Sequence, residues 1–304
     1  MIHHISRIPL INSKASLFVF ADRQQGGSGY RKEAWEEFRH EFKATPNAWA
    51  IGLGDYGDWL RPSMRSRLIS VLSKDDSARG AFEKDILHSH DKIIDDMEFL
   101  KGRLIGIHAG HHLWNLSSGI NTDQRLASAL KAPYLGWIAS TRIVLDTHRP
   151  EKPGGGKNYH GHSSVYTMIS THGNANGRKV PTALSWLENN YASSWIVDQY
   201  VMGHGCKNAN DVPFKRNHIR RIGPPGIEVQ IPRLLVIGGF SEGYTNGWES
   251  DYVEQAGFAP QPMGYGLIRF GTSYRKEHCL AKGVRSGRET RILVVEQLNR
   301  VLSI

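Results

Sequence analysis

The sequence has few cysteines and no long hydrophobic run. Only Cys206 and Cys279 occur among 304 residues. Two cysteines cannot build a disulfide framework, and they suit a reducing compartment such as the cytoplasm. No run of about 18 apolar residues is present, so we expect no membrane-spanning helix and no membrane partner. The first twenty residues also lack the apolar segment and cleavage site of a secretory signal, so we expect a cytoplasmic protein.

The phosphate-binding loop of the common nucleotide hydrolases is also missing. No Gly-x-x-x-x-Gly-Lys-Ser/Thr segment occurs, although the chain contains 32 glycines. That loop holds phosphates through consecutive backbone N–H groups and one lysine. Any phosphate chemistry in this chain must therefore use other side chains.

Acidic residues are outnumbered by basic ones. The chain has 38 Lys and Arg residues against 29 Asp and Glu residues, which gives a net charge of +9. An excess of positive charge favours polyanionic partners such as nucleic acid. The same excess is also common in proteins whose lysines are merely solvated. With 39% hydrophobic and 22% charged residues, the composition is that of a globular protein with material for a core.

The hydrophobic pattern predicts an α/β protein. Short apolar or alternating runs predict strands, and apolar residues at helical spacing predict helices. The strands are expected at 16–21, 48–53, 103–107, 137–145, 163–170 and 196–203, then at 211–222, 228–239, 263–270 and 291–298; the helices at 30–42, 60–72, 81–100, 121–130 and 181–191. We find no linker, so we expect one domain over 1–304, with a strand-rich second sheet at about 208–304.

Five of the apolar runs are followed by a side chain that commonly binds metal ions. A single residue of this kind more often caps a turn, and Asp55 alone is compatible with that role. Five in succession, four of them directly beside glycine, indicate a shared centre where strands of an α/β fold open to solvent. Carboxylate and imidazole ligands suit Mn, Zn or Fe, and two ions sharing a carboxylate would use this many donors. The residues are Asp22, Asp55, His111 with His112, His172, and His204 with Cys206.

The order of these motifs resembles the calcineurin-like metallophosphoesterases. That family carries Asp-x-His, Gly-Asp, Gly-Asn-His, an isolated His and Gly-His-x-His, each after a strand. Here the segments are Asp22-Arg23-Gln24, Gly54-Asp55, Gly110-His111-His112, His172, and Gly203-His204-Gly205-Cys206, over residues 16–207. The resemblance implies a sandwich of two mixed β-sheets flanked by helices.

The resemblance also implies roles for these residues. Asp55 would bridge two divalent transition-metal ions, and His112 would act as a general acid. One metal would face Asp22, Gln24 and Cys206, and the other His111, His172 and His204. Three residues depart from the family pattern: Gln24 replaces His, His111 replaces Asn, and Cys206 replaces the last His. A thiolate at Cys206 would favour softer ions such as Zn or Fe. Asp58 would either orient a ligand or cap a turn.

The expected activity is metal-dependent hydrolysis of a phosphodiester in nucleic acid or a nucleotide. A hydroxide activated by two metals would attack phosphorus, with His112 protonating the leaving oxygen. The alternatives are a phosphomonoesterase or nucleotide pyrophosphatase acting on a small molecule, and a catalytically impaired protein that binds metal and nucleic acid. Lys207 and Arg178 would contact substrate. Five aromatic residues would either stack on bases or anchor loops: Trp114, Tyr159, Tyr244, Trp248 and Tyr265.

Overall fold

The computed structural model describes most of the chain. The described residues are 1–59, 68, 76–147, 163–174, 180–204, 209–211, 215–218, 227–230, 232–242, 262–278 and 287–302.

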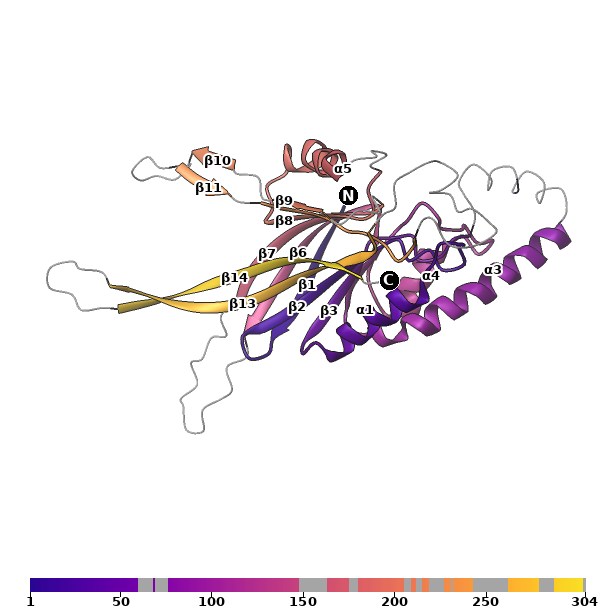
Figure 1. Ribbon diagram of the computed structural model, residues 1–304, viewed down its shortest axis with the longest axis horizontal. Coiled ribbons are helices and arrows are strands. Elements are labelled where there is room, and N and C mark those ends of the chain that lie inside the picture. Colours follow the sequence, from indigo (N-terminus) through magenta and orange to yellow (C-terminus); the bar gives the residue numbers. More distant parts are fainter. Residues whose placement is uncertain are drawn as a thin grey trace.

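Two six-stranded sheets form the centre of the molecule (Figure 1). Each sheet contains both parallel and antiparallel pairs, and helices lie on the outer faces, so the predicted fold class is confirmed. Sheet A consists, in spatial order, of β1 (Ile2–Leu10), β6 (Ile138–Thr147), β7 (Ser163–Thr171), β8 (Gln199–Met202), β12 (Arg233–Val236) and β9 (Ala209–Asp211). Sheet B consists of β14 (Gly287–Val301), β13 (Gly264–His278), β2 (Lys14–Phe20), β3 (Ala48–Gly52), β4 (Leu104–His108) and β5 (Tyr134–Gly136).

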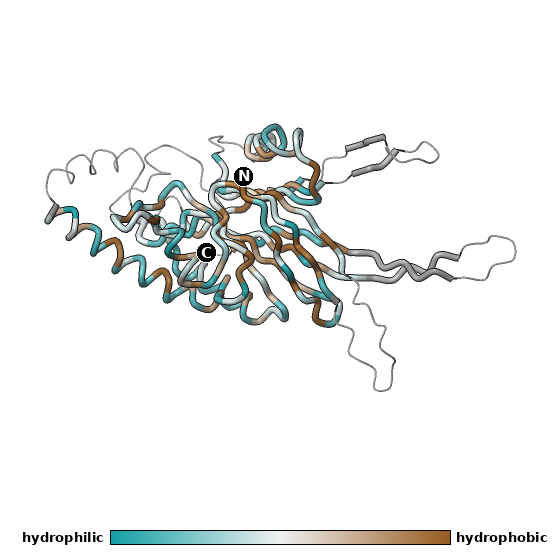
Figure 2. The backbone as a smooth tube through the Cα atoms, turned by 180° about the vertical axis from the view of Figure 1, so that it is seen from behind, coloured by the Kyte–Doolittle hydropathy of each residue, from teal (hydrophilic) through white to brown (hydrophobic). Residues whose placement is uncertain are grey.

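The alternation of side chains along the strands builds two separate apolar layers. On β2, Leu17 and Val19 join a core that includes Ile143 of sheet A, so they face the space between the sheets. Phe18 and Phe20 face the other way and pack with the helices. Successive side chains of a strand point to opposite faces, so one apolar strand supplies both layers. In Figure 2 the most hydrophobic segments follow these central strands.

Helices cover the outer face of each sheet (Figure 1). On sheet B, helix α1 buries Trp35, Phe38 and Phe42 at helical spacing, as predicted for residues 30–42. On sheet A, α5 buries Ala183 and Leu187. The helices are α1 (Lys32–Ala44), α3 (Asp76–Met97) followed by the 3-10 turn η1 (Glu98–Leu100), α4 (Thr122–Ala129), and α5 (Val180–Leu187) followed by the π-helical turn η2 (Glu188–Ala192). The helix predicted at 60–72 lies outside the described residues, apart from Leu68, which is helical.

The N-terminal strand β1 is absent from the predicted elements. It pairs in parallel with β6 at the edge of sheet A. Only Ile8 and Leu10 of this strand are fully buried, whereas Ile5 is exposed. An edge strand with few buried side chains carries a weak periodic signal, which explains why the pattern alone does not identify it.

The two sheets do not divide the chain near residue 207. Strands β6, β7 and β8 join sheet A although they precede that position, and β13 and β14 join sheet B although they follow it. The cause is the pairing of β13 with β2, antiparallel over Gly266–Gly271, which returns the C-terminal strands to the first sheet. A small hairpin, β10 (Lys215–His218) with β11 (Ile227–Gln230), pairs separately. Among the described helices, none has the length and hydrophobicity needed to cross a membrane.

Candidate metal centre

The predicted metal-binding side chains follow strands whose directions bring their ends together. Strands β2, β3 and β4 are parallel neighbours in sheet B, and β7 and β8 are parallel neighbours in sheet A. Parallel strands end at the same edge of a sheet, so the loops after them meet there. The residues in these loops are Asp22, Asp55, His111, His112, His172 and His204.

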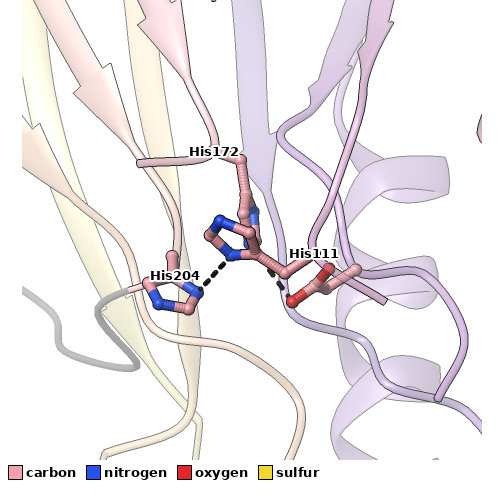
Figure 3. A group of neighbouring side chains, drawn as sticks. His111, His172 and His204 are labelled. Carbon is pink, nitrogen blue, oxygen red and sulfur yellow. Dashed lines mark hydrogen bonds and ion pairs between the residues drawn. The ribbon is translucent and has the colours of Figure 1, made fainter. Parts of the chain in front are cut away.

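Four of these side chains form one compact group (Figure 3). One ligand atom from each of Asp55, His111, His172 and His204 lies within 4.8 Å of every other. Nε2 of His172 is 3.1 Å from Oδ2 of Asp55, and Nδ1 of His111 is 3.1 Å from Nδ1 of His204. Asp55 and His172 are buried, whereas His111 and His204 are partly exposed. The group thus combines a buried floor with an opening to solvent.

The backbone of the metal-ligand loops is strained. Eight described non-glycine residues have positive φ, and four of them lie in these loops: Asp22 at 48°, Gln24 at 46°, Asp55 at 56° and His204 at 54°. Residues other than glycine rarely adopt a positive φ. Such strain persists only where the surrounding structure enforces it, and it gathers at functional sites. The clustering therefore marks the loops as a functional region.

Glycine at position 110 is required by the close approach of two loops. A Cβ atom at Gly110 would lie 2.1 Å from the backbone nitrogen of Asp55 and 2.2 Å from its Oδ1. Gly54 has a φ of 109°, and a Cβ there would be 2.7 Å from the Cα of Gly110. The absence of a side chain at Gly54 and Gly110 lets the loop after β4 pack directly on the Asp55 carboxylate. This close packing explains why glycine precedes Asp55 and His111 in the two motifs.

The polar atoms of the group fit a divalent cation. Oδ1 of Asp22 is buried and has no hydrogen-bond partner within the described part of the chain. Oδ2 of Asp55 and Nε2 of His172 likewise make no hydrogen bond, although they face each other as an ion pair. Nδ1 of His172 donates to the carbonyl oxygen of Leu53 at 2.8 Å. That contact directs Nε2 towards the centre, as in metal sites whose ligand histidines are held by a carbonyl.

The charges in the centre also favour a bound cation. Burial raises the pKa of Asp22 to about 7, with Asp55 adding to the rise. Burial alone would raise the pKa of Asp55, but His172 and His112 outweigh it and hold that pKa below its usual value. Burial would lower the pKa of His172, yet Asp55 and Asp22 raise it to about 9. Two buried carboxylates therefore stabilise positive charge between them, supplied by a proton or by a cation.

His204 has the protonation state that a metal ligand needs. Burial and the neighbouring His172 and His111 together lower its pKa to about 3. Its imidazole is therefore neutral near pH 7, with a lone pair available for coordination. Its backbone N–H donates to Oδ2 of Asp22 at 2.8 Å, which ties the loops after β8 and β2 together.

The ligands predicted for the other metal ion, Asp22, Gln24 and Cys206, lie only partly within the described residues. Asp22 is linked to the centre through His204 but is not one of the four grouped residues. The backbone N–H of Gln24 donates to the carbonyl oxygen of Asp55 at 2.9 Å, which holds the two loops together. Cys206, Lys207 and Arg178 lie outside the described residues. The structure therefore assembles one group of side chains that could hold a metal ion, and the ligands of a second ion remain a prediction.

His112 points differently from its neighbour His111. Its backbone N–H donates to Oδ1 of Asp55 at 2.8 Å, and its Nδ1 lies 2.7 Å from Oδ1 of Asp58. Its Nε2 is 4.0 Å from Oδ2 of Asp55, beside the grouped ligands. The sequence leaves two roles open for Asp58; this contact favours a positioning role, since the carboxylate holds the His112 ring.

Two aromatic residues predicted as base-stacking candidates are buried instead. Trp114 packs against Ile86 in a small apolar cluster, and Tyr265 lies on β13 in the main helix-side core. The stacking prediction is wrong for both, because their rings are already covered by protein. Tyr159, Tyr244 and Trp248 lie outside the described residues.

His90 of α3 is a buried histidine outside the metal-ligand loops. Nη1 of Arg125 lies 2.7 Å from its Nδ1. Burial lowers its pKa to about 4, and the positive charge of Arg125 adds to that effect. His90 thus serves the packing of α3 on α4 and lies apart from the metal-ligand loops.

A segment after β12 supports the centre, although its sequence pattern does not place it among the metal-ligand loops. Gly239-Phe240-Ser241-Glu242-Gly243 has the Gly-x-Ser-x-Gly spacing typical of serine hydrolases. Here a Cβ at Gly239 would lie 2.6 Å from the carbonyl oxygen of Asp22, and the N–H of Phe240 donates to that oxygen at 3.0 Å. The segment therefore holds the Asp22 loop in place.

No family model and no curated protein matches the sequence. The solved structures similar to it include the calcineurin-like phosphoesterase YfkN from Bacillus subtilis, at 10% identity and a TM-score of 0.37, covering 93% of this chain and 90% of that chain. They also include the Staphylococcus aureus protein named "Putative 5'-Nucleotidase", in complex with alpha-ketoglutarate, at 9% identity and a TM-score of 0.40, covering 96% of this chain and 55% of that chain.

Proposed function

We propose that the protein is a metal-dependent phosphoesterase that hydrolyses a phosphodiester in nucleic acid or a nucleotide. The observation that carries the proposal is the group of Asp55, His111, His172 and His204, with His112 beside it. Within this group, Oδ2 of Asp55 and Nε2 of His172 are buried and make no hydrogen bond within the described residues. This donor set suits first-row transition metals such as Mn, Zn and Fe.

The proposed metal set contains two ions. Asp55 would serve both, with His111, His172 and His204 on one side and Asp22, Gln24 and Cys206 on the other. A thiol ligand at Cys206 needs a reducing environment, which is why we place the protein in the cytoplasm. Bound divalent cations would supply a nucleophile from water at neutral pH and neutralise the phosphate oxygens.

The protein's own contribution to the reaction is proton transfer and orientation. His112 would donate the proton on Nε2 to the leaving oxygen, because that nitrogen faces the centre. Asp58 would accept the hydrogen bond from Nδ1 and favour the protonated, acid-competent imidazole. The Leu53 carbonyl would keep His172 in its orientation towards Asp55. No covalent enzyme intermediate is needed.

The distribution of charge supports a polyanionic substrate. Residues 215–230 contain four Lys or Arg and one Glu, and residues 264–301 contain eight Lys or Arg and three Glu. These two segments therefore carry eight of the nine net positive charges of the chain. Positive charge gathered in two segments favours a phosphate backbone over a small phosphoester. Lys207 and Arg178 are the proposed contacts to the phosphate nearest the metals.

We also infer that residues 1–304 form one metallophosphoesterase domain. Sheet A combines β1 with β12, and sheet B combines β2 with β14, so each sheet contains strands from both ends of the chain. A cut anywhere in the middle would separate hydrogen-bonded strands. Such interleaving is typical of one folding unit.

The proposal is tested by measuring metal content and hydrolysis together. The purified protein is supplied with Mn, Zn, Fe, Ni or Mg, analysed for bound metal, and assayed on bis-p-nitrophenyl phosphate. We expect close to two transition-metal ions per chain and hydrolysis that depends on them. Metal binding without hydrolysis of any phosphoester would instead support a catalytically impaired metal- and nucleic-acid-binding protein. Faster hydrolysis of mononucleotides or nucleotide pyrophosphates than of diesters would support the small-molecule alternative.

A further inference from the structure

One large aromatic side chain stands exposed beside the candidate metal centre. Trp137 lies between β5 and β6, and 51% of its surface is exposed. Its ring centroid is 5.4 Å from that of His111, with the two planes inclined by 41°. By contrast, the tryptophans Trp35 and Trp114 are buried in apolar clusters. Trp137 therefore has a solvent-exposed indole ring next to His111, a proposed metal ligand.

The backbone on both sides of this indole is held firmly. The carbonyl oxygen of Gly136 accepts hydrogen bonds from the N–H of Ala109 and from Nδ1 of His108, both at 2.9 Å. The carbonyl oxygen of Trp137 itself accepts from the hydroxyl of Thr171 at 3.0 Å. Ala109 and Thr171 directly precede the loops that carry His111 and His172. The position of Trp137 relative to the metal ligands is thus set by contacts from both sheets.

The surroundings of Trp137 are apolar as well as exposed. Cδ1 of Ile2 lies 3.3 Å from where a Cβ at Gly136 would be, so β1 borders the same rim. Ile2 is 39% exposed and Met1 is 45% exposed. Scattered apolar residues on a surface need no explanation, but here an exposed indole on a hydrogen-bonded backbone adjoins the proposed ligands of metal ions that would bind a phosphate. A ligand that matches both features has a phosphate joined to a flat, apolar part.

We propose that Trp137 is the stacking surface for the base of a nucleotide unit whose phosphate lies at the metal centre. The inference rests on the proposed function, and it adds the chemical class of the substrate. Any of the nucleic-acid bases can stack on an aromatic side chain, because each base has a π-face. Because the backbone of Trp137 is held by hydrogen bonds, stacking would restrict only the two side-chain torsions, so the contact would add binding energy at small entropic cost.

The test compares two phosphate ligands that differ only in the base. Binding of AMP and of ribose 5-phosphate to the metal-loaded protein is measured by calorimetry, for the wild type and for Trp137→Ala and Trp137→Phe. Stacking of one base on an aromatic side chain contributes enough that its removal weakens binding about 5- to 150-fold. Trp137→Ala should therefore weaken AMP binding by that factor and leave ribose 5-phosphate unchanged. Trp137→Phe, which keeps a flat ring, should retain most of the affinity for AMP.

A matched control is available elsewhere on the surface. Trp195 is 41% exposed and precedes β8, whose opposite end leads to His204. Trp195→Ala should therefore change neither affinity. AMP should also quench tryptophan fluorescence in the wild type and in Trp195→Ala, but much less in Trp137→Phe. Metal content should be the same in all variants.

Several outcomes would overturn the inference. Equal weakening of AMP and ribose 5-phosphate in Trp137→Ala would mean that Trp137 only supports the phosphate site. Unchanged AMP binding in that variant, or a wild type that binds both ligands equally, would exclude base stacking at this position. Because binding is measured without turnover, a base-dependent effect of Trp137 in a protein that hydrolyses no phosphoester would sustain the stacking role and refute only the catalytic proposal.

Discussion

Nδ1 of His112 lies 2.7 Å from Oδ1 of Asp58, within hydrogen-bonding distance. The carboxylate holds one side of the imidazole and leaves the other nitrogen, Nε2, on the side of Asp55. A neighbouring negative charge favours the protonated imidazole. The contact orients the His112 ring as its proposed role of general acid requires, whereas the adjacent His111 faces His204.

Replacing His112 by alanine should slow the reaction according to the leaving group. A nucleoside alkoxide leaves poorly without a proton, whereas p-nitrophenolate leaves well on its own. We expect His112→Ala to keep its metals and to lose roughly 10²- to 10⁴-fold in rate on a nucleotide diester. The loss on a p-nitrophenyl ester should be smaller. Steady-state rates on the two substrates, with metal analysis of the same samples, measure this.

His111→Ala serves as the comparison for that experiment. Because His111 belongs to the grouped ligands, the variant should lose metal and both activities together. If the two variants exchange these phenotypes, the assignment of the pair is reversed. If His112→Ala slows both substrates equally with its metals retained, His112 positions the phosphate and does not protonate the leaving group.

Replacing Asp58 by asparagine should weaken the proposed acid catalysis by His112 without abolishing it. The amide can still accept a hydrogen bond from Nδ1, but it no longer favours the imidazolium. Loss of such a supporting carboxylate typically costs about 10- to 100-fold in activity, and we expect a fall of that size on the nucleotide diester. The basic limb of the rate profile, where a general acid loses its proton, should shift to lower pH. An unchanged profile in Asp58→Asn would assign Asp58 to capping its turn.

Asp55→Asn should remove at least one metal ion and nearly all activity. In the proposed centre its carboxylate serves both ions, and an amide offers a single neutral oxygen in its place. Elemental analysis and the bis-p-nitrophenyl phosphate assay measure both effects. A variant with full activity, or a wild type that holds no metal after supplementation, is incompatible with the proposed function.

Binding of DNA should weaken steeply with salt if the net charge serves nucleic acid. Each phosphate neutralised by a protein cation releases counterions, so log K falls linearly with log salt, by about 0.9 per contact on duplex DNA. Lys215→Gln with Arg216→Gln should reduce this slope, since these residues lie in one of the two basic segments. Arg79→Gln with Lys84→Gln, exposed on α3, is the matched control. A DNA affinity that does not change with salt would instead indicate that the substrate is a small phosphoester.

The stability of the protein should fall between pH 7 and pH 5 partly because of His90. Its pKa is about 4 in the folded protein, below the ordinary value of 6.5, because it is buried beside Arg125. The unfolded chain therefore binds more protons below pH 6.5, and the stabilisation present above that pH is lost as pH falls towards 4. For this group the loss between pH 7 and 5 is on the order of 2 kcal/mol.

The matched variant for that measurement is His90→Gln. Glutamine does not titrate and keeps a group able to accept a hydrogen bond from Arg125. Urea denaturation at pH 7 and pH 5 should show a smaller difference for the variant than for the wild type. An equal difference in both proteins would mean that His90 is not the source of the pH dependence.

Most of the elements that carry the centre could be predicted from local patterns. Trp35, Phe38 and Phe42 recur at helical spacing and bury one face of α1, so periodicity alone identifies that helix. The apolar runs before Asp22 and Asp55 become β2 and β3 as predicted. Strand β1 and the return of β13 to β2 escape such analysis, because pairing partners far apart in sequence leave no periodic signal.

The sequence by itself determined the order of the metal-ligand loops and the glycines beside them. Carboxylate and imidazole side chains after successive apolar runs predict a binding site for Mn, Zn or Fe. Only the tertiary structure decided which side chains meet. It grouped Asp55 with His111, His172 and His204, paired His112 with Asp58, buried Trp114, and left Trp137 open beside His111. The physical reason is that these contacts join loops from two sheets, and their distances depend on how the sheets pack rather than on any local spacing.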